Sequence, residues 1–462
     1  MTSPPAPGVD DDDDALSIRA AARDAGDAVG LDWDGRRYTF AELARLTGQR
    51  LGEVERQARD GAPVPLLGTN TLDALLTLYA LLELRLPALL LHPRLTEAER
   101  AAERAAAAQA AALPAGAAAV LYTSGTTGRA RGAVLTRAAL LASARSSAAN
   151  LGWQDDDCWL LAMPLARVGG LSIVTRCLAA RRAVALVPGF DAAQLPQWLE
   201  QRRVTLLSLV PTMLSLLLDA HPGWRPPPRL RAVLLGGAAA SPRLFERAAA
   251  RRLPIVVTYG CTETCSQVAA TPYERRFDAA ACGAGRPLDG VGLRITDGRI
   301  EVRGPMRMAG YLGEPPLDPA AWFDTGDLGE IGADGCLRLH ARRADLIVTG
   351  GENVYPAEVE HVLEACPGVQ AAAVFGLPDE TWGQTVAAAL VAGPQPPDDE
   401  ALAAHLERHL ARHKRPRRIC FVAALPHTAA GKPDRLALAA LAPALRPLPR
   451  PRPPRAGSGP GA

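Results

Sequence analysis

Lysine is nearly absent from this chain of 462 residues, since only Lys414 and Lys432 interrupt a set of basic residues that is otherwise arginine. A background of arginine leaves each lysine as a candidate for a position where a compact, flexible ammonium is needed and a planar guanidinium does not serve. Lys432 follows Gly431 in the turn-like stretch "LPHTAAGKPDR". This setting predicts that Lys432 reaches into a reaction centre.

A strong charge imbalance and a long apolar run are also missing. The net charge of +2 gives no case for nucleic acid or a membrane surface as a partner. The first residues show neither a basic region nor an apolar region of a secretory signal. The most apolar stretch, 71–93, is interrupted by Glu83 and Arg85 and falls short of a membrane span. We therefore expect a cytoplasmic protein, with a homodimer as one option for its assembly.

Paired cysteine motifs are missing as well. The eight cysteines include no CxxC pair, and a chain of this length has a core large enough to need no disulfide staples. Cys261 and Cys265 are four residues apart in "YGCTETCSQ", but no histidine lies near them in the sequence. We expect neither a disulfide framework nor a metal site from these cysteines.

What the chain does have is a phosphate-like loop at residues 121–136, "LYTSGTTGRARGAVLT". Its glycines let backbone amides approach an anion, its hydroxyls add donors, and Arg129 and Arg131 add charge. A Walker A loop needs Gly-Lys followed by Ser or Thr, but the single Gly-Lys here, at 431–432, precedes Pro433. The dinucleotide pattern GxGxxG is absent too, so the loop indicates a phosphate site of another kind.

Short apolar runs alternate with helical segments from residue 120 onward, which predicts an α/β fold with mostly parallel sheets covered by helices. The phosphate-like loop follows the run "AAVLY", at the carboxyl end of a predicted strand. Beyond residue 345 a compact α+β unit has its own strand and helix signals. We predict a tail over 1–14, a large domain over 15–343, a small mobile domain over 344–444 and a second tail over 445–462.

Six motifs in order make the chain resemble the adenylate-forming superfamily of acyl-CoA synthetases, adenylation domains and luciferases. They are "YTSGTTGRARG", "LLGGAAA", "TYGCTETC", "WFDTGDLG", "ARRADLIVTGGENVYPAEVE" and "PHTAAGKPDR". The resemblance implies that a carboxylate attacks the α-phosphate of ATP, with Mg²⁺ as cofactor, and that the acyl group then passes to the thiol of CoA.

The resemblance also implies roles for residues of the large domain. Glu263 would bind Mg²⁺, and Arg131 stands where the family usually has Lys, which keeps the charge but changes its geometry. Asp327 and Arg342 would hold the ribose hydroxyls, and Lys432 would bridge the attacking carboxylate and the α-phosphate. The residues expected around the phosphates and the adenine are Thr123, Ser124, Gly125, Thr126, Thr127, Gly128, Gly236, Gly237, Ala238, Tyr259, Gly260 and Thr262.

In this superfamily the small domain rotates between the two half-reactions. The hinge position is Ala344 here, where many relatives carry Asp or Lys, and alanine can adopt the backbone angles of a hinge. Gly350 and Gly351 would line the pantetheine channel, and Lys414 is a candidate contact to the phosphates of CoA.

Which carboxylic acid is activated is harder to infer from the sequence. Several stretches, such as "GGENVYPAEVE", resemble o-succinylbenzoate-CoA ligases of menaquinone biosynthesis, whose substrate carries a second carboxylate. Where many relatives have an aromatic residue and His, this chain has Ala166 and Arg167. We expect Arg167 and Gly170 at the acyl pocket, with Arg167 paired to the carboxylate that does not react.

Three alternatives stay open at this point. A synthetase for another aryl or medium-chain acid fits the nucleotide motifs equally well. An amino-acid adenylation domain fits less well, because no Asp stands where an amine partner is expected. A non-catalytic nucleotide-binding relative would explain the departures at Ala130, Arg131 and Ala344, but retention of Lys432 argues against it.

Overall fold

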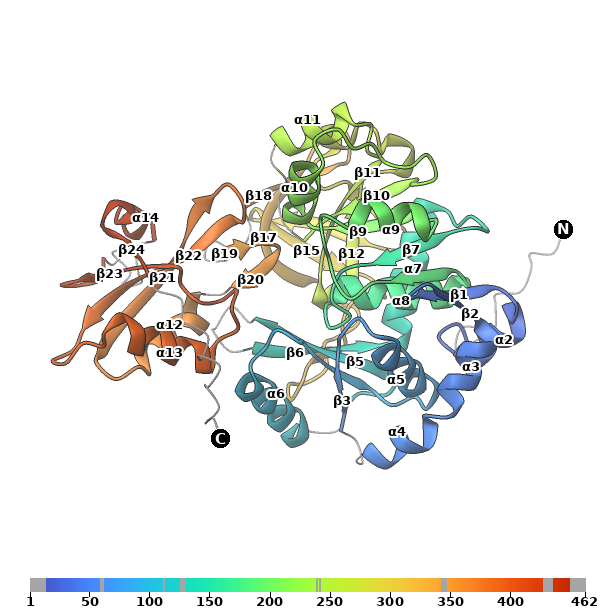
Figure 1. Ribbon diagram of the computed structural model, residues 1–462, viewed down its shortest axis with the longest axis horizontal. Coiled ribbons are helices and arrows are strands. Elements are labelled where there is room, and N and C mark those ends of the chain that lie inside the picture. The colour runs from blue at the N-terminus through green and yellow to red at the C-terminus, as the bar shows by residue number, and fades with distance from the viewer. Residues whose placement is uncertain are drawn as a thin grey trace, which may run out of the picture. The chain divides into compact units, whose positions relative to one another are not determined.

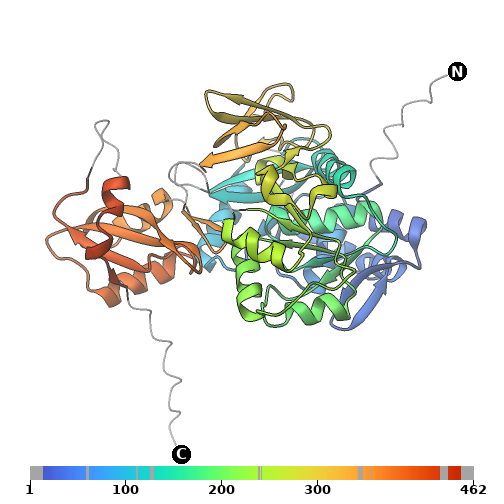
Figure 2. The ribbon, with the colours of Figure 1, turned by 90° about the horizontal axis from the view of Figure 1, so that it is seen from above.

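The computed structural model describes residues 14–58, 62–110, 113–124, 130–237, 240, 242–341, 347–354, 356–426 and 435–448. The chain divides into two compact units (Figures 1 and 2). The larger unit holds the described residues up to 341, apart from 94–101, 124 and 130, and the smaller unit holds these and the residues from 347 onward. Among the described residues, no helix has the length and apolar character needed to cross a bilayer.

The main sheet of the larger unit has nine strands in the order β13-β12-β11-β10-β9-β7-β8-β1-β2. Strands β7, β9 and β10 are buried along their whole length, as expected where helices cover both faces of a parallel sheet. The parallel strands are β1 (Val29–Trp33), β7 (Cys158–Leu161), β8 (Ala183–Leu186), β9 (Leu206–Leu209), β10 (Ala232–Leu235) and β11 (Ile255–Cys261). Antiparallel strands complete both edges: β2 (Arg36–Thr39), β12 (Ser266–Ala270) and β13 (Arg286–Pro287).

A second sheet of five strands carries the segments on both sides of the phosphate-like loop. Its order is β16-β6-β5-β4-β3, so the strand before that loop belongs to a different sheet from β7 to β11. Alternation of strands and helices along the sequence does not reveal this division, because it does not say which strands pair. The strands are β3 (Val64–Leu67), β4 (Ala88–Leu91), β5 (Ala117–Ser124), β6 (Ala130–Thr136) and β16 (Gly310–Tyr311).

Helices α5, α7 and α8 contribute to one buried core that also includes leucines of both sheets. Threonine side chains cap several of these helices: Thr71 accepts from the amide of Ala74, and Thr136 accepts from that of Ala139. The helices are α2 (Ile18–Ala25), α3 (Phe40–Gly48), α4 (Leu51–Gln57), α5 (Leu72–Glu83), α6 (Glu97–Gln109), α7 (Arg137–Leu151), α8 (Val168–Ala180), α9 (Leu195–Gln201), α10 (Pro211–Ala220) and α11 (Pro242–Ala250).

A four-stranded antiparallel sheet follows in the larger unit, in the order β14-β15-β17-β18. Its strands are β14 (Gly292–Thr296), β15 (Arg299–Arg303), β17 (Phe323–Ile331) and β18 (Leu337–Ala341). A disulfide joins Cys282 to Cys336, directly before β18. The sequence predicted no need for a disulfide, and this prediction is wrong, because chain length says nothing of two thiols that meet across 54 residues.

The smaller unit is an α+β structure built on one sheet. The order is β20-β19-β22-β23-β24, and β21 pairs with β22 over its whole length. Helices α12 (Pro356–Glu364) and α13 (Asp399–His409) lie together, and α12 packs on β21 (Figure 1). Residues 446 and 447, expected in the C-terminal tail, pair with β23. The remaining elements are β19 (Ile347–Thr349), β20 (Glu352–Val354), β21 (Val369–Asp379), β22 (Gly383–Ala392), β23 (Arg418–Val422), α14 (Arg435–Ala439) and β24 (Arg446–Pro447).

Candidate active site

Glu263 lies just beyond the carboxyl end of β11, in the short 3-10 helix Thr262–Thr264. The residue is only 6% exposed, and its Oε1 accepts hydrogen bonds from the Tyr311 hydroxyl at 2.9 Å and from Thr123 Oγ1 at 3.4 Å. Burial is the main cause, and the neighbouring Glu263 carboxylate the second, of a raised pKa of the Tyr311 hydroxyl. The phenol therefore stays protonated and donates a hydrogen bond to Glu263. The structure thus brings Glu263 next to the strand end that leads into the phosphate-like loop.

The turn that follows Glu263 has an unusual backbone, because Cys265 and Ser266 both have positive φ angles, of 50° and 94°. Two of the contacts that hold this turn join it to α7 and β11. The Ser143 hydroxyl of α7 donates to the Cys265 carbonyl at 2.7 Å, and the Ser266 carbonyl packs so closely on Gly260 that an added Cβ would lie 1.6 Å from its oxygen. Glycine at 260 is therefore required by the fold of the turn that carries Glu263.

Arg131 lies at the start of β6 and makes contacts that a lysine cannot reproduce. Its Nε and Nη2 donate to the Glu314 carboxylate at 2.7–3.1 Å, as a forked pair. Its guanidinium also lies over the ring of Tyr311, with 3.4 Å between the guanidinium carbon and the ring centroid. Tyr311 therefore contacts Arg131 with its face and Glu263 with its hydroxyl.

Tyr259 of β11 and Asp327 of β17 meet between two sheets of the larger unit. The Tyr259 hydroxyl lies 2.9 Å from Asp327 Oδ2 and 3.0 Å from Thr325 Oγ1, which in turn donates to the Ile300 carbonyl. Burial, followed by the Asp327 carboxylate, raises the pKa of the Tyr259 phenol. Tyr259 is only 3% exposed, so in this structure it connects β11 to β17, and its stacking on adenine stays a prediction.

Gly236 and Gly237 follow β10, beside β11 in the main sheet. An added Cβ on Gly236 would lie 2.3 Å from Thr258 Oγ1, and Gly237 has a φ of +80°. The backbone here therefore runs close to β11 in a conformation that favours glycine. This places the amides of the predicted adenine-flanking segment at the same edge of the sheet as Tyr259 and Glu263.

The predicted acyl-pocket residues stand at the start of α8. Arg167 is the N-cap residue, half-buried, with an extended backbone (φ −106°, ψ 147°) and no side-chain cap hydrogen bond. Gly170 is buried in the first turn, and a Cβ there would lie 2.2 Å from the Pro164 carbonyl oxygen. The packing of the chain before α8 thus requires glycine at 170, and the role of Arg167 toward a substrate stays a prediction.

In the smaller unit, Gly350 and Gly351 form the two-residue turn of the β19–β20 hairpin, with φ angles of 59° and 79°. Two consecutive positive φ values are the mark of a type I′ turn, which favours glycine at both positions. Lys414 is only 8% exposed, and its Nζ lies 2.5 Å from Glu358 Oε1 and 3.4 Å from Glu99 Oε1. All three residues have a structural role here, and their contacts to CoA stay predictions.

Several predicted site residues lie outside the described part of the chain. These are Gly125, Thr126, Thr127, Gly128, Ala238, Arg342, Ala344 and Lys432, and of Ser124 only the backbone, at the end of β5, is described. Three residues of the site were missed by the sequence reasoning: Ser143, Tyr311 and Glu314. Tyr311 and Glu314 belong to "AGYLGEP", which reads as a strand and turn, and nothing local in it signals a contact with residues 131 or 263.

The surroundings of Glu263 fit Mg²⁺. The ion takes hard oxygen ligands and usually binds through one or two carboxylates together with the phosphates of its substrate. Among the described residues no group of three His, Cys, Asp or Glu side chains forms a cage of protein ligands alone. Glu263, with the hydroxyls of Thr123 and Tyr311 beside it, offers one buried carboxylate of the kind that such a shared site uses.

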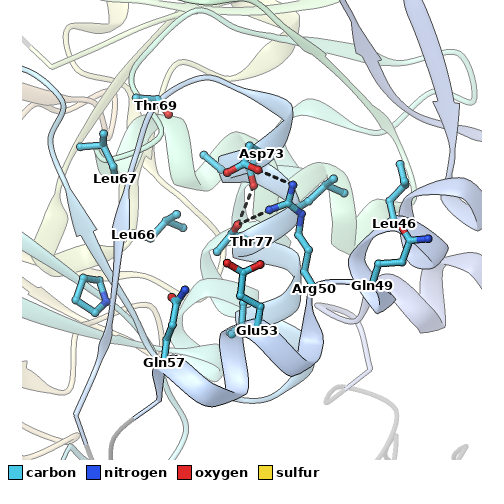
Figure 3. Close-up of a pocket in the computed structure, with 14 residues that line it drawn as sticks. Leu46, Gln49, Arg50, Glu53, Gln57, Leu66, Leu67, Thr69, Asp73 and Thr77 are labelled. Atoms are coloured by element: carbon cyan, nitrogen blue, oxygen red, sulfur yellow. Dashed lines mark hydrogen bonds and ion pairs between the residues drawn. The ribbon is translucent and has the colours of Figure 1, made fainter.

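A separate open pocket of about 710 Å³ lies between α4, α5 and β3, and Figure 3 shows its polar side chains pointing into it. Arg50 Nη2 there lies 2.5 Å from Asp73 Oδ1. None of the residues that line this pocket belongs to the predicted site.

Two known family models match the chain. Residues 100–312 match the model of the AMP-binding enzymes, and residues 358–432 match that of the AMP-binding enzyme C-terminal domain. A protein of Listeria monocytogenes named 2-succinylbenzoate-CoA ligase is 34% identical over 446 residues, which cover 88% of this chain and 95% of that protein. A second protein of that name, from Enterococcus faecalis, is 39% identical over 335 residues, or 68% of this chain and 67% of that one.

Solved structures of an o-succinylbenzoate CoA synthetase from Bacillus subtilis are also similar. A double mutant of it, bound with its product analogue, is 30% identical, with a TM-score of 0.83 over 91% of this chain and 97% of that one. The same synthetase in complex with ATP and a magnesium ion is 30% identical, with a TM-score of 0.64 over 91% of this chain and 98% of that one.

Proposed function

This chain belongs to the family of AMP-binding enzymes, and on that premise we propose that it is an ATP-dependent o-succinylbenzoate-CoA ligase of menaquinone biosynthesis. One carboxylate of the acid attacks the α-phosphate of ATP, which forms the acyl-adenylate and releases pyrophosphate. The thiol of CoA then attacks the acyl carbon, which gives the thioester and releases AMP. The Listeria monocytogenes relative of this name matches 88% of the chain, and the two family models match segments of both units.

The observation that carries the proposal is the meeting of Glu263, Thr123 and Arg131 at the strand ends around the phosphate-like loop. In this proposal Thr123, which precedes the loop in the sequence, and Arg131, which follows it, bind the β and γ phosphates of ATP. Glu263 would hold Mg²⁺, and the ion would supply positive charge to the phosphates when bound. The Asp327 carboxylate accepts hydrogen bonds from the ribose hydroxyls. Lys432, which lies outside the described residues, stabilises the charge that develops during adenylation.

The second carboxylate of the acid needs a cation, and we assign that role to Arg167 at the start of α8. In a half-buried position a guanidinium binds a carboxylate through a forked, charge-assisted pair. The turn of α8 that contains Gly170 stays close to the Pro164 carbonyl and fixes the backbone beside Arg167. The hinge at Ala344, the cytoplasmic location and the homodimer expected from the sequence stay predictions.

The test is exchange of radiolabelled pyrophosphate into ATP, measured with a panel of acids. The proposal requires exchange that depends on o-succinylbenzoate, and Arg167→Ala should raise its KM about tenfold with little change in kcat. A monocarboxylic aryl acid should show no such change, and Arg182→Ala, at the other end of α8, is the matched control. Exchange with other acids alone would keep the ligase and reject this substrate.

A further inference from the structure

Glu314 is placed beside Arg131 by the backbone and not by a flexible surface encounter. The amide of Ala309 donates to the Val134 carbonyl at 2.9 Å, and the amide of Leu312 donates to the Gly132 carbonyl at 2.7 Å. The amide of Glu314 closes a turn onto the Tyr311 carbonyl at 3.0 Å. The segment that leads to Glu314 is therefore paired to β6 as far as Gly132, the residue next to Arg131.

The pair that results occupies most of the polar edge of the Arg131 guanidinium. Nε donates one hydrogen bond to Glu314, and Nη2 donates two. Nη1 makes no hydrogen bond to a described residue. Phosphate oxygens and carboxylate oxygens accept hydrogen bonds from the same N–H groups, in the plane of the guanidinium. Pyrophosphate that reaches Arg131 must therefore share this edge with Glu314 or displace it, and it meets the negative charge of Glu314 as it does so.

Arg131 stays in position during such an exchange because its guanidinium packs on the ring of Tyr311. The ring contact is at 3.4 Å, and the Tyr311 hydroxyl is fixed by Glu263 at 2.9 Å. A lysine at 131 would lack both the fork for Glu314 and the flat face for Tyr311. The departure from the family's lysine is thus matched by two neighbours that suit an arginine.

We propose that Glu314 competes with pyrophosphate for the guanidinium of Arg131 and thereby weakens the hold of the enzyme on pyrophosphate, which favours its release after adenylation. This inference rests on the proposed function, since it names pyrophosphate as the anion of that site. Glu314 acts through Arg131 and is a positioning residue.

The test is calorimetric titration of the full-length protein with magnesium pyrophosphate, which needs no acid substrate. Glu314→Gln keeps the size and one acceptor of the side chain but removes its charge, and it should bind pyrophosphate about fivefold more tightly than the unaltered protein. Asp24→Asn is the matched control, because Asp24 is also an exposed carboxylate that accepts from Nε and Nη2 of an arginine, Arg181. It should leave the affinity for pyrophosphate unchanged.

A double-variant comparison links the effect to Arg131. In an Arg131→Gln background, Glu314→Gln should change the affinity less than twofold, because the group for which Glu314 competes is gone. Damage to the fold would weaken binding, so a gain in affinity separates competition from a structural role. Unchanged or weaker binding by Glu314→Gln, or no binding of pyrophosphate by any variant, would overturn the inference. A failure of acid-dependent exchange, with the gain in affinity intact, would count against the proposed function alone.

Discussion

In the larger unit Glu263, Thr123 and Arg131 come from three different elements and meet around one loop, whereas in the smaller unit Lys414 is buried against Glu358 and the glycine pair 350–351 forms a hairpin turn. The same kind of motif resemblance led to both sets of residues. The first set has polar groups that gather where phosphates are expected, and the second set already serves the fold. A motif residue can thus be retained for chemistry, for structure, or for both, and side-chain partners separate these cases.

The largest effect is expected from a substitution of Lys414, which tests whether this residue serves the fold of the smaller unit. Lys414→Met leaves the carboxylate of Glu358, which has a side-chain exposure of 17%, without its cation, and should destabilise the smaller unit by about 3–5 kcal/mol. Hydrogen exchange of α12 and β21 in the full chain should rise accordingly. Arg412→Met removes an exposed cation from the same segment and serves as the control. Normal exchange combined with a raised KM for CoA would instead support the CoA contact predicted from the sequence.

Glu263→Gln tests the other side of the comparison. The amide keeps the shape of the side chain but loses the charge that holds Mg²⁺, so the adenylation rate should fall about 100-fold without a loss of thermal stability. Pyrophosphate exchange at several Mg²⁺ concentrations measures this, and the exposed Glu274→Gln is the control. A fall in melting temperature that accounts for the lost rate would show that Glu263 is structural, like Lys414.

Gly350→Ala tests how far the stability of the β19–β20 hairpin turn depends on glycine. The substitution places a Cβ in a residue with φ +59° and 2.7 Å from Trp382 Cε3, so it should destabilise the smaller unit by about 1–2 kcal/mol. Hydrogen exchange of the amides of β19 and β20 is a direct readout. Gly48→Ala, at a helical position with no atom within 4 Å, should have no such cost. Equal effects of the two substitutions would contradict the turn as the reason for glycine.

The smallest effect is expected from two buried serines of α7. Ser143→Ala removes the hydrogen bond to the Cys265 carbonyl and the one that the hydroxyl accepts from the buried Arg176 at 3.3 Å, which should together cost about 1–2 kcal/mol and raise the Mg²⁺ requirement through the turn after Glu263. Ser147 is buried to the same 2%, but its hydroxyl has no hydrogen-bond partner among the described residues, so Ser147→Ala should change neither quantity. Melting curves and Mg²⁺ titrations of exchange compare the two, and matching results would show that Ser143 does not position the turn.

Much of this fold was predictable because its signals are local. Fully apolar runs such as "AVLL" became buried strands, and the order of six motifs identified the family and the candidate residues. Pairing over long distances was not predictable. Tyr311 meets Glu263 across 48 residues and Glu314 meets Arg131 across 183, and no local pattern reports such contacts. The Cys282–Cys336 disulfide and the division of the strands between two sheets were missed for the same reason.

The most direct measurement is mass-spectrometric detection of the CoA thioester after incubation of the protein with ATP, Mg²⁺, CoA and o-succinylbenzoate. The account predicts o-succinylbenzoyl-CoA together with AMP and pyrophosphate, and its loss in Lys432→Ala. Thioester formation that prefers other acids would contradict the assigned substrate, and no thioester from any acid would contradict the assignment of this chain as a ligase.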